Sequence, residues 1–134
     1  MEVETKLAVY PTASSLLLME KLCNHWILNV LLTLGNAKEK PMKYGEIKKS
    51  VHSKSDKMLD TSLKELDAYG LIKKHYHFIS PKHYTTDYCL TDQGRLFLNS
   101  ITPLNNWINE NFESIQSNLA AYNQERLAIA SLDN

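Results

Sequence analysis

The 134-residue chain carries 15 basic and 15 acidic residues, is 43% hydrophobic and contains two cysteines. This length predicts one domain, and the composition is that of a globular protein rather than a disordered chain or a disulfide scaffold. Because no apolar run reaches the roughly 18 residues of a membrane span and the N-terminus has acids in place of a basic signal region, we expect a cytoplasmic protein without membrane contact.

The neutral total charge conceals an uneven distribution along the chain. Residues 36–83 carry eleven lysines and six acids, whereas the residues before them sum to −1 and those after them to −4. A basic centre between neutral and acidic flanks is typical of a protein that presents one face to phosphates and another to a partner. A solvated lysine-rich surface without a ligand is the alternative.

The N-terminal third predicts an arm followed by one long helix. Residues 1–12 show little periodicity and end near Pro11, whereas helical spacing of apolar residues from Ala13 predicts a helix over 13–35. The helix is apolar on more than one side, so we expect it to lie between its own domain and a partner subunit. Its expected dimer contacts are Leu16, Met19 and Trp26.

Residues 43–70 predict two helices joined by a tight turn. Tyr44, Ile47 and Val51 share one face of a short helix, and only His52-Ser53-Lys54 separates it from the next helix. Two helices joined so closely cross at a steep angle, as in a helix-turn-helix.

The second helix of this unit, residues 55–69, is marked at both ends. Ser55 is its predicted N-cap, Asp56 suits the helix dipole in the first turn, and Gly70 ends it. Its apolar spacing predicts a buried face that comprises Leu59, Leu63 and Leu66. The outward face is then basic and polar, and it comprises Lys57, Thr61, Lys64 and Ala68.

Residues 71–90 predict a β-hairpin. Residues 71–78 are rich in aromatic and β-branched types, residues 87–90 suit a return strand, and Pro81 lies in the connection, where a missing N–H costs little. The predicted tip, residues 80–86, carries Lys82, His83 and Tyr84. A helix-turn-helix with a basic hairpin is a winged helix, so we expect a mainly α fold with a small β-hairpin wing, of the α+β class.

Residues 92–128 predict C-terminal helices that hold a dimer together. Thr91 is the expected cap, and Pro103 is expected to start a new helix or to kink the old one. Beyond it, apolar residues recur every three or four positions between polar ones, and this stripe needs a partner. The expected dimer contacts are Leu104, Trp107, Ile108, Phe112, Ile115 and Leu119. Folding back on the first helix of the same chain is the alternative.

An ordered set of short motifs runs from Leu22 to Trp107. The set comprises Trp26-Ile27-Leu28, Lys43-Tyr44-Gly45-Glu46-Ile47, Ser55-Asp56-Lys57-Met58-Leu59, Leu63-Lys64-Glu65-Leu66, Gly70-Leu71-Ile72, Pro81, Tyr88-Cys89-Leu90-Thr91 and Gly94. In this order and spacing it resembles the HxlR-type transcriptional regulators, a dimeric branch of the MarR-like winged helices. The resemblance implies a homodimer in a prokaryotic cytoplasm, associated with the nucleoid when it binds double-stranded DNA.

The chain also departs from the pattern of that family. Cys23-Asn24-His25 stands where the family commonly has Gly-Gly-Lys, and the segment 81–88 is about two residues longer than expected, which predicts an extended wing. Several family members sense electrophiles or oxidants through an N-terminal cysteine, which is absent from Pro11-Thr12-Ala13-Ser14, so that role does not carry over. A redox signal would then fall to Cys23 or Cys89, although the spacing of Cys23 from Trp26 favours core packing.

These features together predict a dimeric, sequence-specific DNA-binding regulator, expected to be a repressor. Helix 55–69 would enter the major groove, the wing would contact backbone or minor groove, and two-fold symmetry implies a near-palindromic operator. The candidate DNA contacts are Lys43, Lys54, Ser55, Lys57, Thr61, Lys64, Lys74, Lys82, His83 and Tyr84. A winged-helix module that binds protein without specific DNA binding is the alternative, and a small-molecule or redox effector is left open.

The sequence offers no constellation for catalysis. It has no Ser/His/Asp or Cys/His set, no phosphate-binding glycine loop and no metalloprotease motif, so we expect neither an enzyme nor a cofactor. His75 and His77 share a strand face that His83 could reach, which suggests a metal site. An ordinary exposed strand face near neutral charge is the favoured interpretation, and no metal is predicted.

Overall fold

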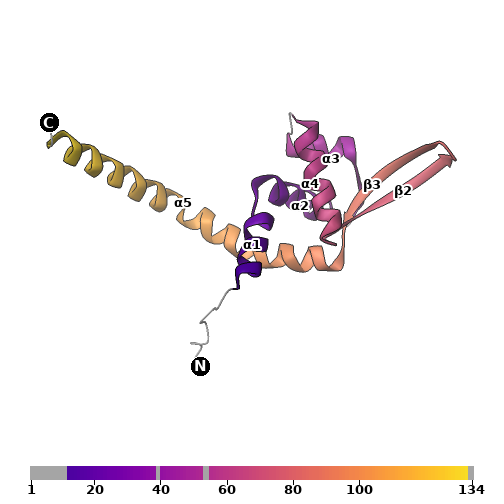
Figure 1. Ribbon diagram of the computed structural model, residues 1–134, viewed down its shortest axis with the longest axis horizontal. Helices are drawn as coiled ribbons and strands as arrows, with labels where there is room; N and C mark the ends of the chain where they lie inside the picture. Colours follow the sequence, from indigo (N-terminus) through magenta and orange to yellow (C-terminus); the bar gives the residue numbers. More distant parts are fainter. Residues whose placement is uncertain (1–11, 39, 53–54, 133–134) are drawn as a thin grey trace, which may run out of the picture. The chain divides into compact units, whose positions relative to one another are not determined.

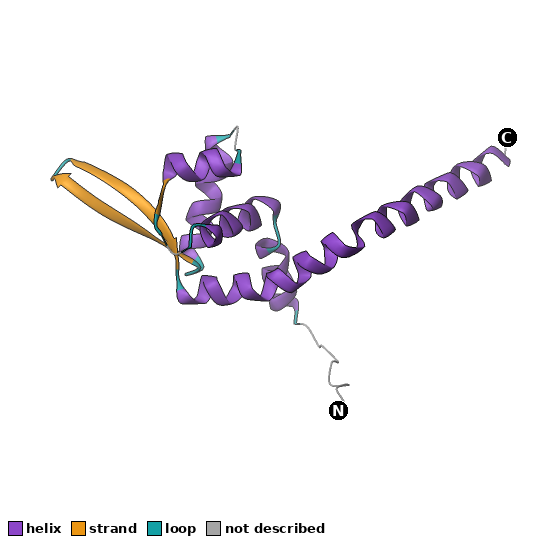
Figure 2. Cartoon of the chain, turned by 180° about the vertical axis from the view of Figure 1, so that it is seen from behind, coloured by secondary structure: helices purple, strands orange, loops and turns teal. Residues whose placement is uncertain are grey.

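The computed structural model describes residues 12–38, 40–52 and 55–132. In chain order the elements are α1 (Ala13–Leu22), α2 (His25–Asn36), β1 (Met42–Lys43), α3 (Tyr44–Val51), α4 (Asp56–Ala68), β2 (Ile72–Ser80), β3 (His83–Leu90) and α5 (Asp92–Leu132) (Figure 1). The chain forms two compact units, and the boundary between them lies inside α5, between residues 96 and 97. The predicted class is confirmed, since the fold is mainly helical with a small antiparallel sheet (Figure 2).

The predicted single helix over 13–35 is wrong, because the segment forms two helices. The side chain of Asn24 accepts hydrogen bonds from the backbone N–H groups of Trp26, at 2.8 Å, and Ile27, at 3.4 Å. This capping requires an extended backbone at Asn24, with φ −84° and ψ 144°, which interrupts the helical path. Of the predicted N-terminal arm, residues 1–11 lie outside the described residues, and Thr12 caps α1.

The core of the first unit forms where α2 packs against α3 and α4. α2 contributes the buried residues Ile27, Val30, Leu31 and Leu34, and α3 contributes Ile47 and Val51. The amide of Asn29 on α2 donates to the backbone carbonyl of Val51 at 3.5 Å, which ties α2 to the end of α3. α2 is therefore the central helix on which the helix-turn-helix rests.

The boundaries and the buried face predicted for α4 are confirmed. The Ser55 hydroxyl accepts from the Met58 N–H at 3.2 Å, and Gly70 follows the helix with φ +77°, a conformation that glycine adopts without strain. The spacing that predicted the inner face also holds, since the buried apolar residues are Leu59, Leu63 and Leu66. At about 25 cal/mol per Å² of apolar area, burial of these leucines stabilises the packing of the helix on the core.

The sheet has three strands in the order β1-β3-β2, all antiparallel. The short strand β1 was not predicted, because two residues show no periodicity; Met42 pairs with Tyr88 and Lys43 with Asp87. The wing strands are longer than predicted, since pairing continues from Ile72 and Leu90 out to Ser80 and His83. The predicted tip over 80–86 is therefore wrong, and Pro81 and Lys82 alone form the turn.

The junction after the wing is a tight, hydrogen-bonded corner. The Thr91 hydroxyl donates to the Gly70 carbonyl at 2.6 Å and accepts from the Gly94 N–H at 3.0 Å, so Thr91 caps α5 as predicted. Gly94 lies against the Leu71 carbonyl, where an added Cβ would overlap the oxygen. The corner therefore requires glycine at position 94 for close approach rather than for backbone freedom.

α5 is one continuous 41-residue helix, and Pro103 lies inside it. The two C-terminal helices expected over 92–128 are thus a single element, in which Pro103 supplies no backbone donor. Within the second unit the large apolar side chains from Leu104 to Leu119 are each more than 40% exposed in the single chain. Among the described residues, no helix combines the length and apolar character needed to cross a bilayer.

Replacing Gly94 by alanine should lower the melting temperature. Crowding a closely packed position costs about 1–3 kcal/mol, and that range corresponds to a shift of several degrees in a domain of this size. Gly45→Ala is the matched control, because a Cβ at Gly45 would meet nothing within 4 Å. It should leave the melting temperature unchanged or raise it, as alanine favours helix. Thermal denaturation followed by circular dichroism measures both, and equal melting of the two variants would contradict the packing of the corner.

Candidate nucleic-acid interface

Polar contacts connect α3 to the first turn of α4. Lys48 Nζ lies 2.6 Å from Asp56 Oδ1, and the Tyr44 hydroxyl donates to the same oxygen at 3.3 Å. Hydrogen bonding and charge from Lys48 lower the pKa of the Asp56 carboxyl. Burial, reinforced by Asp60 and Asp56, raises the pKa of the Tyr44 hydroxyl, which therefore remains a neutral donor.

The outward face of α4 presents the four residues predicted there. Lys57, Thr61, Lys64 and Ala68 are all exposed, opposite the buried leucines. The Thr61 hydroxyl donates to the Lys57 carbonyl at 2.9 Å, which leaves its oxygen as an acceptor toward solvent. Ser55 is half-buried and caps the helix, so it has a structural role. It also lies next to the exposed N-terminal turn of α4.

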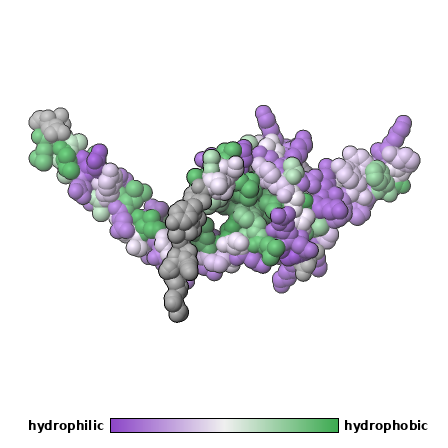
Figure 3. Space-filling model, turned by 60° about the horizontal axis from the view of Figure 1, so that its bottom comes forward, coloured by the Kyte–Doolittle hydropathy of each residue, from purple (hydrophilic) through white to green (hydrophobic). Residues whose placement is uncertain are grey.

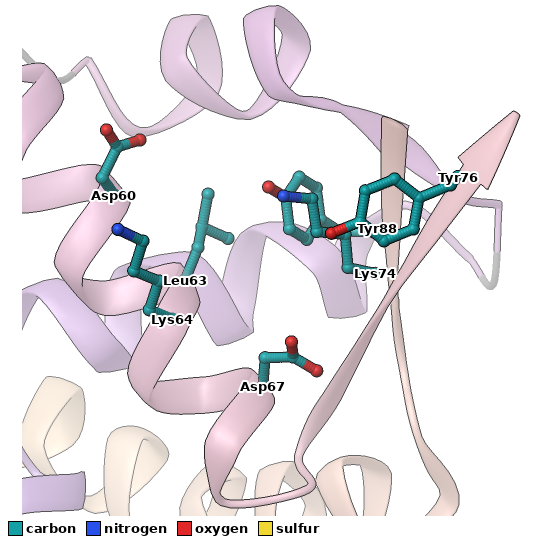
Figure 4. Close-up of a pocket in the computed structure, with 7 residues that line it drawn as sticks. All are labelled: Asp60, Leu63, Lys64, Asp67, Lys74, Tyr76 and Tyr88. Atoms are coloured by element: carbon teal, nitrogen blue, oxygen red, sulfur yellow. The ribbon is translucent and has the colours of Figure 1, made fainter. Parts of the chain in front are cut away.

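A recess of about 390 Å³ separates α4 from the wing (Figure 4). Its wall on α4 consists of Asp60, Leu63, Lys64 and Asp67, and its wall on the wing consists of Lys74, Tyr76 and Tyr88. The lysines were predicted from the sequence, whereas the two aspartates were not. Asp60 lies three residues after Lys57, and Asp67 lies three residues after Lys64. Side chains three residues apart are neighbours on a helix, so this spacing places both aspartates beside the basic face. The recess is consequently balanced in charge rather than basic.

Lys74 reaches into this recess from the wing. Its ammonium lies 5.1 Å from the ring centroid of Tyr76 and 5.9 Å from that of Tyr88, within the range of a cation–π contact. Burial lowers the pKa of Lys74, but the Tyr88 and Tyr76 side chains raise it by more, so the net direction is upward. Lys74 therefore carries its charge at neutral pH.

The remaining predicted contacts lie on the wing and on its outer strand. Lys82, His83 and Tyr84 are exposed at the wing tip, where the Ser80 hydroxyl and His83 Nδ1 are 3.0 Å apart. Lys43 is exposed on β1 and is not among the residues that line the recess. Lys54 lies outside the described residues. The structure thus places Lys64 of α4 and Lys74 of the wing in the wall of one recess. The tip residues lie further along the wing than Lys74.

The other face of the wing carries a polar cluster. Asp87, which is 16% exposed, lies 2.8 Å from His77 Nε2 and 3.5 Å from His75 Nδ1. Sequence reasoning grouped these histidines with His83 and missed Asp87, whose role follows only from its pairing with His75 across the strands. Within the described ranges, no three His, Cys, Asp or Glu side chains are arranged to hold a metal ion.

The two cysteines occupy different environments. Cys23 is exposed beyond the end of α1, so the interpretation of Cys23 as a core residue is wrong for the single chain. Cys89 is half-buried, with its sulfur 3.9 Å from His75 Nδ1. An oxidant in solution would therefore reach Cys23 more readily.

All but one of the predicted dimer residues are exposed to solvent in the single chain. Leu16 and Met19 are exposed on α1, and Trp26 is half-buried at the start of α2. On α5 the exposed set comprises Leu104, Trp107, Ile108, Phe112, Ile115 and Leu119. Figure 3 shows hydrophobic residues recurring along this helix.

A helix-turn-helix with an outward lysine face and a flanking β-hairpin defines the class of winged helix-turn-helix DNA-binding proteins. The HxlR-like helix-turn-helix family matches residues 21–116. The chain therefore belongs to the HxlR-like helix-turn-helix family, as its motifs predicted, and is a DNA-binding transcriptional regulator rather than an enzyme.

Individual relatives agree with this assignment. The HTH-type transcriptional regulator YdzF of Bacillus subtilis is 37% identical over 82 residues, which are 61% of this chain and 72% of YdzF. The HTH-type transcriptional regulator BH0655 of Halalkalibacterium halodurans is 32% identical over 83 residues, 61% of this chain and 69% of BH0655. The structure of ytfH from Salmonella typhimurium has the same fold, with a TM-score of 0.66 and 20% identity over 79% of this chain and 90% of ytfH.

The Asp56–Lys48 contact predicts a pH dependence of stability. Because the folded-state pKa of Asp56 is lowered, its contribution is present above its unfolded pKa and is lost as pH falls through the folded pKa. Asp56→Asn should therefore melt below the wild type at neutral pH, with a difference that shrinks toward pH 3. Asp67→Asn, eleven residues further along the chain, is the control and should show no such convergence. A difference between Asp56→Asn and wild type that is constant with pH would exclude the ion pair as its cause.

Proposed function

We propose that the chain acts as a homodimer that binds a near-palindromic operator and represses an adjacent gene. The observation that carries this proposal is the face of α4 that presents Lys57, Thr61 and Lys64 to solvent beside a long wing. An α-helix fits the major groove, where the four base pairs differ in their donors and acceptors. Repression follows if the operator overlaps the promoter, because the bound dimer then blocks polymerase.

The phosphate contacts in this proposal come mostly from lysine. The chain has only two arginines, Arg95 and Arg126, so bidentate guanine contacts contribute little and counterion release contributes much of the affinity. Lys74 faces α4 across the recess, so a backbone strand that crosses there passes between Lys64 and Lys74. Lys43, Lys82 and His83 would extend the phosphate contacts on either side, as would Lys54.

Dimerisation rests on the apolar side chains that the single chain leaves uncovered. On α5 these side chains recur every three or four residues, which is the spacing of a helical contact face. On α1, Leu16 and Met19 are each more than half exposed. Burial of these residues against a second copy would offset the entropy of association. Two-fold symmetry then places the two α4 helices on half-sites about 34–36 Å apart, or a multiple of this spacing.

The acidic residues of α4 support a second candidate function, a module that binds protein. The helix carries four acids, Asp56, Asp60, Glu65 and Asp67, against two lysines, and Asp56 pairs with Lys48 of α3. Selection from randomised duplex DNA separates the two functions. A regulator enriches one near-palindromic sequence and binds it with strong salt dependence, whereas an interaction module enriches none.

Replacing Lys57 and Lys64 together by alanine should weaken binding to the selected duplex at least tenfold without lowering the melting temperature, because both side chains are exposed. The slope of log K against log salt, about 5 if six phosphates are neutralised per dimer, should fall by about one for each lysine that contacts a phosphate. Fluorescence anisotropy between 50 and 200 mM salt measures the affinity and its salt slope, and thermal denaturation checks the melting temperature. Lys21→Ala on α1 is the matched control, and equal affinities of the two variants would remove Lys57 and Lys64 from the interface.

Introducing charge on the apolar face of α5 should dissociate the dimer. We expect Phe112→Glu combined with Ile115→Glu to sediment as a 15.4 kDa monomer at micromolar concentration, whereas wild type sediments at twice that mass. The control, Glu113→Lys, also changes charge on α5 but lies outside the apolar stripe and should remain dimeric. A monomeric wild type would overturn the dimer proposal.

A further inference from the structure

The outer half of the wing carries an exposed aromatic cluster that comprises Tyr76, Phe78 and Tyr84. These side chains are 51%, 65% and 52% exposed, respectively. The ring centroids of Tyr76 and Phe78 are 6.3 Å apart, and each lies 5.4 Å from that of Tyr84. The contacts between the rings hold them as a preformed apolar surface, and apolar residues gathered in this way on a surface mark an interaction site.

The aromatic cluster lies on the face of the wing that is turned toward α4. Side chains alternate along a strand, so Tyr76 and Phe78 share a face with Lys74, and Tyr84 pairs directly with Phe78. Lys74 and Tyr76 also line the recess opposite Lys64 of α4 (Figure 4). A duplex that lies along α4 therefore continues onto the aromatic cluster.

The length of the wing matches the step from one DNA groove to the next. At about 3.3 Å per residue, the six steps from Ile72 to Phe78 span roughly 20 Å. Half a helical turn of DNA is about 17 Å, so with α4 in the major groove the aromatic cluster reaches the adjacent minor groove. Lys74 beside Tyr76 and Lys82 in the turn bracket the rings with positive charge, which suits the phosphates on either side of a groove.

We propose that the aromatic cluster is a minor-groove wedge, in which Phe78 inserts at a base step beside each half-site, unstacks it partly and bends the duplex. The inference rests on the proposed function, because it requires α4 in the neighbouring major groove. Apolar side chains that enter the minor groove act in this way, and pyrimidine–purine steps yield most easily. The wedge thus adds sequence preference at positions that α4 does not contact.

The test uses the full-length protein and the selected duplex. End-to-end energy transfer reports bending, and 2-aminopurine placed at successive flanking steps reports unstacking. We expect wild type to shorten the end-to-end distance and to raise 2-aminopurine fluorescence at one step per half-site. Phe78→Ala should abolish both signals and weaken binding five- to twentyfold, whereas Phe78→Leu, which keeps an apolar wedge, should retain them.

Ile79→Ala is the matched control, because Ile79 is adjacent, apolar and 79% exposed but is not part of the aromatic cluster. It should bend DNA like wild type and bind within twofold. Wild-type binding without bending or unstacking would overturn the wedge and leave the proposed function intact, whereas absence of any selected duplex would overturn both. Sedimentation tests whether the aromatic cluster docks a second copy of the chain instead, and a changed oligomeric mass of Phe78→Ala would overturn the wedge.

Discussion

The packing of the leucine face of α4 against α2 determines which face of α4 is exposed. Leu59 and Leu66 are fully buried, and because a helix has only one orientation that buries them, the opposite residues must face solvent. The Asp56 contacts with Lys48 and Tyr44 connect the start of α4 to α3. The core thus determines which side chains α4 presents to solvent.

The wing differs between its two faces in a way that follows from strand geometry. One face carries Lys74 and the aromatic residues and lines the recess beside α4, whereas the other carries His75, His77 and Asp87. The base of the hairpin contributes Ile72 and Tyr88 to the core, whereas the outer half exposes Tyr76, Phe78 and Tyr84 to solvent. Asp60 and Asp67 balance Lys64 and Lys74, so the recess carries both signs of charge.

The sequence predicted those parts of the fold whose causes are local. The leucine spacing, the Ser55 cap and Gly70 defined α4, and the family motifs defined the class of protein. Features that depend on contacts between distant residues could not be predicted from the sequence. The strand β1 depends on pairing with Tyr88 and Asp87. The position of Asp87 beside two histidines depends on the register of the strands. The break at Asn24 was local and visible as an N-cap residue, but continuous apolar spacing outweighed it. The candidate lysines were predicted, whereas the acids and rings beside them required the fold.

The corner at Thr91 connects the start of α5 directly to the end of α4. The Thr91 N–H donates to Leu71 at 3.1 Å, its hydroxyl donates to Gly70 at 2.6 Å, and Gly94 leaves no space between the two backbones. Backbone hydrogen bonds and a close backbone approach therefore tie the start of α5 to the segment that follows α4. Any larger residue at position 94 would have to separate these two stretches of backbone, so the path of the chain into α5 depends on a missing side chain.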